Sequence, residues 1–307
     1  MNLSSVLFPR HLAADKNARA PDAPLVAINI FSGPPARYLH PPMSPSADYL
    51  DQCRKLIEVV GSQQPAIQQA ADWFAETILA GRMVHLFGSG HSRILVEEMW
   101  PRYGSFPGFN PIVELSLSFH NLVVGPNGQR QAMFLENVSG LAERILRNFD
   151  LSPRDSALVA SSSGCNVVPI EIAERFRERG LKVVAIISRK HSEASASRHP
   201  SGKKLQDFAD VVLDTGAPAG DAMVQVVGLE TRVSPGSTVG GCLLVNCLKA
   251  EIAARLTKAG QPPLVLVSPA VVGAKKAGQL FEAAYDEHAR RLARLYQNLG
   301  ASNSASG

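Results

Sequence analysis

Hydrophobic and polar positions follow two patterns along this chain: short apolar runs, and longer segments in which apolar residues recur at helical spacing. The apolar runs predict β-strands at Met83–Phe87, Ile112–Leu115, Ala157–Ala160, Val183–Ile187, Val211–Leu213 and Leu264–Val267. The helical segments are Ser92–Tyr103, Gly140–Phe149, Val167–Arg179, Thr238–Leu256 and Ala277–Leu299. Because strands that are apolar throughout are buried on both faces, this alternation predicts a mostly parallel sheet between two layers of helices.

Two further helices are predicted over Tyr49–Gly81, ahead of the first strand, and residues 43–300 are expected to form a single domain. Residues 1–42 contain seven prolines and lack the basic and apolar regions of a secretory signal, so we expect a disordered extension there. Met43 is followed by a helix-capping Ser44, and our hypothesis is that the natural chain begins at Met43 and that the upstream part is a mis-called start. Residues 301–307 are predicted to be a disordered tail.

Composition and charge exclude several classes of function. The 307 residues are 45% hydrophobic and 19% charged, which is ordinary for a globular protein. A net charge of +4 without basic runs argues against a nucleic-acid partner, and no stretch is apolar enough to predict a membrane span. The four cysteines lack C-x-x-C spacing, which favours reduced thiols in the cytoplasm over a zinc site.

Two glycine turns that carry serines, Gly88–Ser92 and Ser161–Asn166, directly follow the first and the third of these apolar runs. A helix that begins directly after a strand presents free backbone N–H groups at its positively polarised end, and neighbouring hydroxyls complete a cradle for phosphate. The carboxyl ends of parallel strands meet at one edge of the sheet, where ligands bind. The sequence therefore predicts a phosphate site made by Ser89, Gly90, His91, Ser92, Ser161, Ser162, Ser163 and Asn166.

These turns have other interpretations. Either turn can be a structural or solvated turn with nothing bound. A dinucleotide site would need a small residue where Arg93 stands, and no acidic residue clearly ends the second strand. Later in the chain, Ser237 and Thr238 precede a long helical segment, where they form either a simple helix cap or a third polar wall of the site.

Three residues are candidates for proton transfer: Glu98, His199 and Glu230. Glu98 lies on the apolar side of its predicted helix, where an unpaired carboxylate is costly, so it has either a catalytic role or an ion pair with Arg93 or Arg102. His199 lies in a loop at the predicted functional edge, and histidine is the side chain that titrates near neutral pH, although a loop histidine can equally be incidental.

Together these motifs resemble the sugar isomerase (SIS) domain family. Gly88–Ser92 is similar to the first glycine-serine turn of phosphoheptose isomerases and N-acetylmuramic acid 6-phosphate etherases, and Ser161–Asn166 is similar to their serine-rich phosphate loop. Val233–Val239 resembles the etherase segment that begins a late helix, and His199–Leu205 resembles a segment of one branch of the family. The resemblance implies a flavodoxin-like, three-layer αβα fold with a mostly parallel five-stranded sheet and an N-terminal helical hairpin.

The resemblance also implies a function. Our leading hypothesis is an aldose–ketose isomerase of a sugar phosphate, in which Glu98 moves a proton through an enediol and His199 or Glu230 assists ring opening, without a metal or organic cofactor. The alternatives are an amino-sugar-phosphate lyase or etherase and a non-catalytic phosphosugar sensor. Apolar helices at Tyr49–Leu79 and Thr238–Leu256 exceed what one small sheet must cover, which predicts a homodimer or homotetramer with sites near the subunit interface.

Overall fold

Parallel strands in the order β2-β1-β3-β4-β5 form the central sheet of the computed structural model. The strands are β1 (Val84–Gly88), β2 (Phe109–Ile112), β3 (Ser156–Ala160), β4 (Lys182–Ile187) and β5 (Val211–Asp214). All neighbouring pairs are parallel. The structure describes residues 44–297, except 121, 123 and 124, together with residue 299. The predictions for residues 1–42, Met43 and residues 301–307 lie outside this part.

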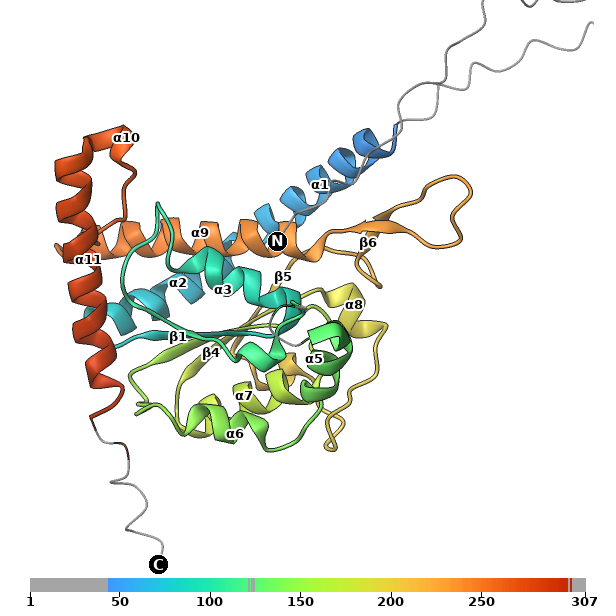
Figure 1. Ribbon diagram of the computed structural model, residues 1–307, viewed down its shortest axis with the longest axis horizontal. Helices are drawn as coiled ribbons and strands as arrows, with labels where there is room; N and C mark the ends of the chain where they lie inside the picture. Colours follow the sequence, from blue (N-terminus) through green and yellow to red (C-terminus); the bar gives the residue numbers. More distant parts are fainter. Residues whose placement is uncertain (1–43, 121, 123–124, 298, 300–307) are drawn as a thin grey trace, which may run out of the picture. The chain divides into compact units, whose positions relative to one another are not determined.

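Helices cover both faces of the sheet (Figure 1). Val84 and Leu86 of β1 pack into one core with α2 (Gln64–Leu79), α3 (Arg93–Met99) and α9 (Ser237–Lys258). Phe87 belongs to the core of the other face, which includes α6 (Leu141–Leu146) and α7 (Val167–Glu178). The three-layer αβα prediction is confirmed, because uniformly apolar strands need cover on both sides.

The two predicted N-terminal helices are present, as α1 (Pro45–Gly61) and α2. Ser44 caps α1, since its hydroxyl accepts a hydrogen bond of 3.3 Å from the Ala47 N–H. In Figure 1 both helices lie along α9, one after the other. Leu56 of α1 also packs on a small antiparallel hairpin of β6 (Ala222–Val224) and β7 (Val233–Pro235).

Several shorter elements complete the described part. They are η1 (Gly90–Ser92), η2 (Leu115–Leu117), η3 (Gly125–Asn127), α5 (Gln129–Leu135), α8 (Arg189–Glu193), η4 (Leu205–Phe208), α10 (Pro269–Val272) and α11 (Ala274–Arg294).

Some sequence predictions need correction. Leu264–Val267 is not a strand. Leu266 is buried in the core, but its backbone N–H donates a hydrogen bond to the Ser105 carbonyl and its carbonyl accepts one from the Gly104 N–H, in a loop. Apolar packing therefore explains this run without a place in the sheet. The second strand lies a few residues earlier than predicted, because the Glu114 side chain accepts hydrogen bonds from Ser116 and starts η2.

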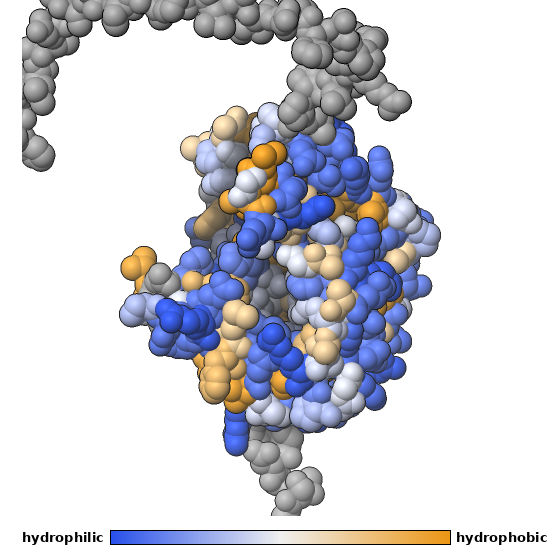
Figure 2. Space-filling model, turned by 90° about the vertical axis from the view of Figure 1, so that its right-hand side faces the viewer, coloured by the Kyte–Doolittle hydropathy of each residue, from blue (hydrophilic) through white to orange (hydrophobic). Residues whose placement is uncertain are grey.

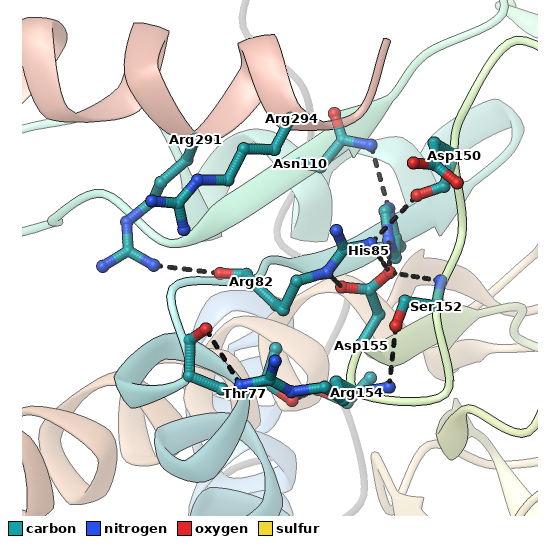
Figure 3. A network of polar contacts seen from close by, with 12 residues as sticks. Thr77, Arg82, His85, Asn110, Asp150, Ser152, Arg154, Asp155, Arg291 and Arg294 are labelled. Atoms are coloured by element: carbon teal, nitrogen blue, oxygen red, sulfur yellow. Dashed lines mark hydrogen bonds and ion pairs between the residues drawn. The ribbon is translucent and has the colours of Figure 1, made fainter. Parts of the chain in front are cut away.

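A buried polar network joins elements near the amino ends of the strands (Figure 3). Arg82 donates two hydrogen bonds of 2.7 Å to the Asp155 carboxylate. Nε2 of His85 lies 3.4 Å from Oδ2 of Asp155, and Nδ1 of His85 lies 3.0 Å from the side-chain amide nitrogen of Asn110. Burial opposes the charge on Asp155, but hydrogen bonds from His85 and Arg82 lower the pKa of Asp155 to about 2. Arg291 of α11 donates to the Arg82 carbonyl at 2.9 Å, so the network also holds the last helix.

Candidate functional site

A cavity of about 490 Å³ opens at the carboxyl ends of β1, β3, β4 and β5. Figure 2 faces this side of the molecule and shows a hollow bordered mostly by hydrophilic residues. Strands β1 and β3 are neighbours in the sheet, while the chain continues from β1 outward to β2 and from β3 outward to β4. The cavity thus lies at the point where the strand order reverses, which is where open α/β sheets bind ligands.

The cavity brings together most of the predicted binding residues. They are Ser89, His91, Ser92, Ser161, Ser162, Ser163, Asn166, Ser237 and Thr238. Gly90 does not line the cavity itself. Its φ of +54° and a distance of only 2.4 Å between an added Cβ and the Phe119 ring show why no side chain fits there. Phe119 covers the first turn and does line the cavity.

The second serine turn presents unused donors to the cavity. The Gly164 N–H is bonded to Ser161 Oγ at 3.2 Å, and the Cys165 N–H to Ser163 Oγ at 3.3 Å. The backbone N–H groups of Ser162 and Ser163, by contrast, make no hydrogen bond to any described residue. Because these groups lie beside the N-terminal end of α7, where the helix dipole is positive, they are suited to bind an anion.

The beginning of α9 differs from the serine turns, because a carboxylate of the protein already occupies it. Asp221 accepts hydrogen bonds of 2.7 Å from both the Ser237 N–H and the Ser237 hydroxyl, and one of 3.1 Å from the Gly236 N–H. Ser237 and Thr238 line the cavity, but the donors of Ser237 are engaged. The N–H groups of Ser162 and Ser163, which bond to no described residue, remain available to a ligand.

Glu136 is the acid that sequence reasoning missed. It follows α5, lines the cavity and is 4% exposed. The amide nitrogen of Asn166 donates to Glu136 Oε2 at 2.5 Å, and the Ser89 side chain also bonds to this carboxyl. Burial raises the pKa of Glu136, although these hydrogen bonds and the charge of Arg198 act in the opposite direction. A buried carboxyl with a raised pKa inside a cavity is suited to proton transfer.

A sequence signal for Glu136 exists. Glu136 directly follows the apolar run Ala132–Leu135, and a carboxylate beside such a run needs a partner or a task. The same argument singled out Glu98. The choice between the two acids depends on the fold, which turns the end of α5 toward the cavity.

Glu98 lies on α3 and does not line this cavity, so its position adds no support to its predicted role as the catalytic acid. Its carboxylate is paired with Arg102, accepts a hydrogen bond of 2.8 Å from Asn246, and lies 3.8 Å from Lys249 Nζ. Burial favours the neutral acid, yet the hydrogen bonds from Asn246 and Arg102 and the charge of Lys249 bring the pKa of Glu98 below its usual value. The structure thus matches the ion-pair interpretation with Arg102.

His199 and Glu230 do not line the cavity either. His199 Nδ1 lies 2.7 Å from Ser201 Oγ within its own loop, and Glu230 is exposed in the connection between β6 and β7. The histidines that do line the cavity are His91 and His191, and His191 Nδ1 lies 3.3 Å from Ser162 Oγ. These two are therefore the histidines positioned to act on a bound ligand.

Across residues 44–297, apart from the three gaps, and residue 299, no cluster of three or more His, Cys, Asp or Glu side chains is arranged to hold a metal ion. No helix in the same part has the length and apolar character needed to cross a membrane. The four cysteines are free thiols.

Comparisons with known proteins agree with the motifs. A family model described as the SIS domain matches residues 48–188, which include both serine turns and Glu136. UPF0309 protein BH3325 of Halalkalibacterium halodurans is 37% identical over 233 residues, which cover 75% of this chain and 94% of that protein. UPF0309 protein Lm4b_02611 of Listeria monocytogenes is 33% identical over 253 residues, which cover 82% of this chain and 99% of that protein.

Among solved structures, phosphoheptose isomerase GmhA from Neisseria gonorrhoeae aligns with a TM-score of 0.43 and 16% identity, over 68% of this chain and 96% of that one. The alignments with the two UPF0309 relatives cover nearly the whole length of each relative.

The chain therefore belongs to the UPF0309 family and carries an SIS domain over residues 48–188.

Proposed function

We propose that the protein binds a phosphorylated sugar in this cavity and acts on it as an aldose–ketose isomerase. The observation that carries the proposal is the buried carboxyl of Glu136, which lies in one cavity with two serine turns at the reversal point of the sheet. The cavity volume of about 490 Å³ suits a small-molecule ligand.

The phosphate is proposed to bind at the second serine turn. The free N–H groups of Ser162 and Ser163 and the nearby N-terminal end of α7 supply donors and a positive potential. Ser92, which lines the cavity from the first turn, is proposed to add a hydroxyl on the opposite side of the phosphate. This arrangement would leave the sugar carbons to extend toward Glu136.

Glu136 is proposed to move the proton. As a carboxylate it would remove a proton from the carbon beside the carbonyl group, which gives an enediol, and then return that proton to the adjacent carbon. The hydroxyl proton moves between the two oxygens in the same exchange, with His91 or His191 as the second proton-transfer group. A positioned base of this kind contributes about 10²–10⁴-fold to the rate.

We also propose that the protein works as a homodimer or homotetramer. Leu50 and Ile57 on α1 are 57% and 55% exposed, and Val227 in the hairpin connection is fully exposed. Exposed apolar side chains on neighbouring elements are typical of association surfaces. Light scattering on the purified protein tests this proposal, and a monomer at micromolar concentration would contradict it.

The function is tested with phosphorylated sugars. A thermal-shift screen of pentose, hexose, heptose and amino-sugar phosphates identifies a ligand, and NMR in D₂O then follows deuterium at its carbons. We expect an isomeric sugar with deuterium at one carbon. Release of an acid would indicate the lyase or etherase alternative, and binding without exchange would indicate a sensor.

Two variants make this test specific for Glu136. Glu136→Gln keeps the size of the side chain, so it should retain the thermal shift and lose deuterium exchange. Glu97→Gln is the matched control, because the Glu97 side chain is 59% exposed on α3 and outside the cavity. Exchange that survives in Glu136→Gln would contradict the assignment.

A further inference from the structure

The loop from Ser195 to Lys204, which contains His199, is bound to the second serine turn. The Arg198 N–H donates to the Cys165 carbonyl at 2.9 Å, and the Leu205 N–H donates to the Gly164 carbonyl at 2.8 Å. Two backbone hydrogen bonds to the same turn fix the loop relative to the proposed phosphate cradle. The loop thereby places the Arg198 side chain at the rim of the cavity.

Arg198 is connected to Glu136 through one intermediate side chain. Its Nη1 donates to Asn166 Oδ1 at 3.1 Å, and the amide nitrogen of Asn166 donates to Glu136 Oε2. The Ser89 side chain is hydrogen-bonded to the same carboxyl. A continuous chain of hydrogen bonds thus runs from the rim, past the second turn, to the first turn.

The Arg198 guanidinium has unused capacity. It has five N–H donors, and its side chain makes a single hydrogen bond within the described part of the chain, to a neutral amide oxygen. Among the described residues that line the cavity, Arg198 is the only arginine and none is a lysine. A phosphate dianion is a stronger partner for a guanidinium than an amide oxygen is.

We propose that Arg198 pairs with the phosphate of the ligand and, through Asn166, couples phosphate binding to the proton on Glu136. The inference rests on the proposed function, since it places phosphate at the second turn and proton transfer at Glu136. When Arg198 turns toward the phosphate, Glu136 loses a nearby positive charge and gains a nearby negative one. Both changes favour the protonated carboxyl. By linkage, a protonated Glu136 must in turn favour anion binding to the same extent.

Other charged groups around the cavity must be separated from this effect. Ser89 and Asn166, which touch the Glu136 carboxyl, are neutral. His91 on η1 and His191 on α8 also strengthen anion binding when protonated, and Asp221 on the hairpin side weakens it. The contribution of Glu136 to the pH dependence of anion binding is the contribution that Glu136→Gln removes.

Sulfate is the probe for the experiment, because it remains a dianion across the range in which carboxyls and histidines titrate. The affinity of the protein for sulfate is measured by thermal-shift titration from about pH 5 to about pH 8, with sodium chloride of equal ionic strength as the reference. We expect Arg198→Gln to weaken sulfate binding about tenfold and Arg198→Lys to restore part of it, because a charged hydrogen bond is lost and then partly replaced. Arg189→Gln is the matched control, because Arg189 is exposed on α8 and does not line the cavity.

The coupling is read from a double-mutant cycle. Glu136→Gln should strengthen sulfate binding severalfold in the otherwise unchanged protein and reduce its pH dependence, and its effect should be smaller together with Arg198→Gln. Equal sulfate affinity in Arg198→Gln and the unchanged protein, or additive effects of the two substitutions, would overturn the inference and leave the phosphate site intact. No sulfate binding by the unchanged protein would overturn the inference together with the proposed function.

Discussion

The amide nitrogen of Asn166 lies 2.5 Å from Oε2 of Glu136, and this contact joins the beginning of α7 to the end of α5 inside the cavity. It lowers the pKa of a carboxyl that burial alone would raise. Asn166→Ala removes the donor, so the pKa of Glu136 should rise further, because the charged form loses a hydrogen bond. Carbon-13 NMR of the labelled Glu136 carboxyl measures the titration. An unchanged titration would show that the contact does not act on the proton.

The second serine turn provides a direct test of the phosphate cradle. Ser162→Asp places a carboxylate beside the unused N–H groups, where it competes with and repels a bound anion. We expect the thermal shift by sulfate or by a sugar phosphate to disappear. Ser152→Asp is the comparison, because Ser152 lies before β3, at the other end of that strand from the cavity. A thermal shift that survives in Ser162→Asp would move the anion site elsewhere.

Gly90 should be intolerant of a side chain for a steric reason. Gly90→Ala brings a Cβ to 2.4 Å from the Phe119 ring at a φ of +54°, so it combines conformational strain with a clash. Gly104→Ala has the strain alone, because Gly104 has a φ of +83° and nothing within 4 Å of an added Cβ. Strain of this kind costs on the order of 1 kcal/mol, and the clash adds to it. Urea denaturation should show a larger loss of stability for Gly90→Ala, and equal losses would contradict the close approach of Phe119.

Asp155 should make the stability of the fold depend on acid. Its pKa is lowered from 3.8 to about 2, so its contribution is present above pH 3.8 and is lost as the pH falls toward about 2. Asp155→Asn breaks the pairing with Arg82 and His85, and removing one partner of a buried ion pair costs about 3–5 kcal/mol. Denaturation curves at several pH values should show lower stability for Asp155→Asn at neutral pH and a smaller loss in acid. A parallel pH dependence in both proteins would contradict this role.

Glu98 should affect stability and leave ligand binding unchanged. Glu98→Gln weakens the pairing with Arg102 and leaves Lys249, which is buried, without a nearby carboxylate. Lys249 keeps its hydrogen bond of 2.8 Å to the Glu98 backbone carbonyl, and a loss of about 1–3 kcal/mol is expected from the weakened charged contacts of the side chain. The sulfate affinity should stay the same because Glu98 does not line the cavity. A weaker affinity without a loss of stability would return Glu98 to the site.

Local pattern was sufficient to predict the layers of the fold and the two serine turns, because apolar runs and turn residues report on their immediate surroundings. It was insufficient for Leu264–Val267, whose apolar side chains pack in the core without joining the sheet. It was also insufficient to choose between Glu98 and Glu136. Both acids lie beside apolar residues, and only the path of the chain shows that one reaches Lys249 and the other reaches the cavity.

The carboxylate of Asp221 makes one end of the cavity more negative than the other. Since it already balances the positive end of α9, a ligand that entered with its phosphate toward α9 would meet a negative charge, whereas the opposite orientation meets open N–H groups. One cap within the protein thus makes the two ends of the cavity unequal. Under the proposed function, a sugar with a single phosphate would have one favoured orientation, and its reactive carbons would come to the same place in each binding event.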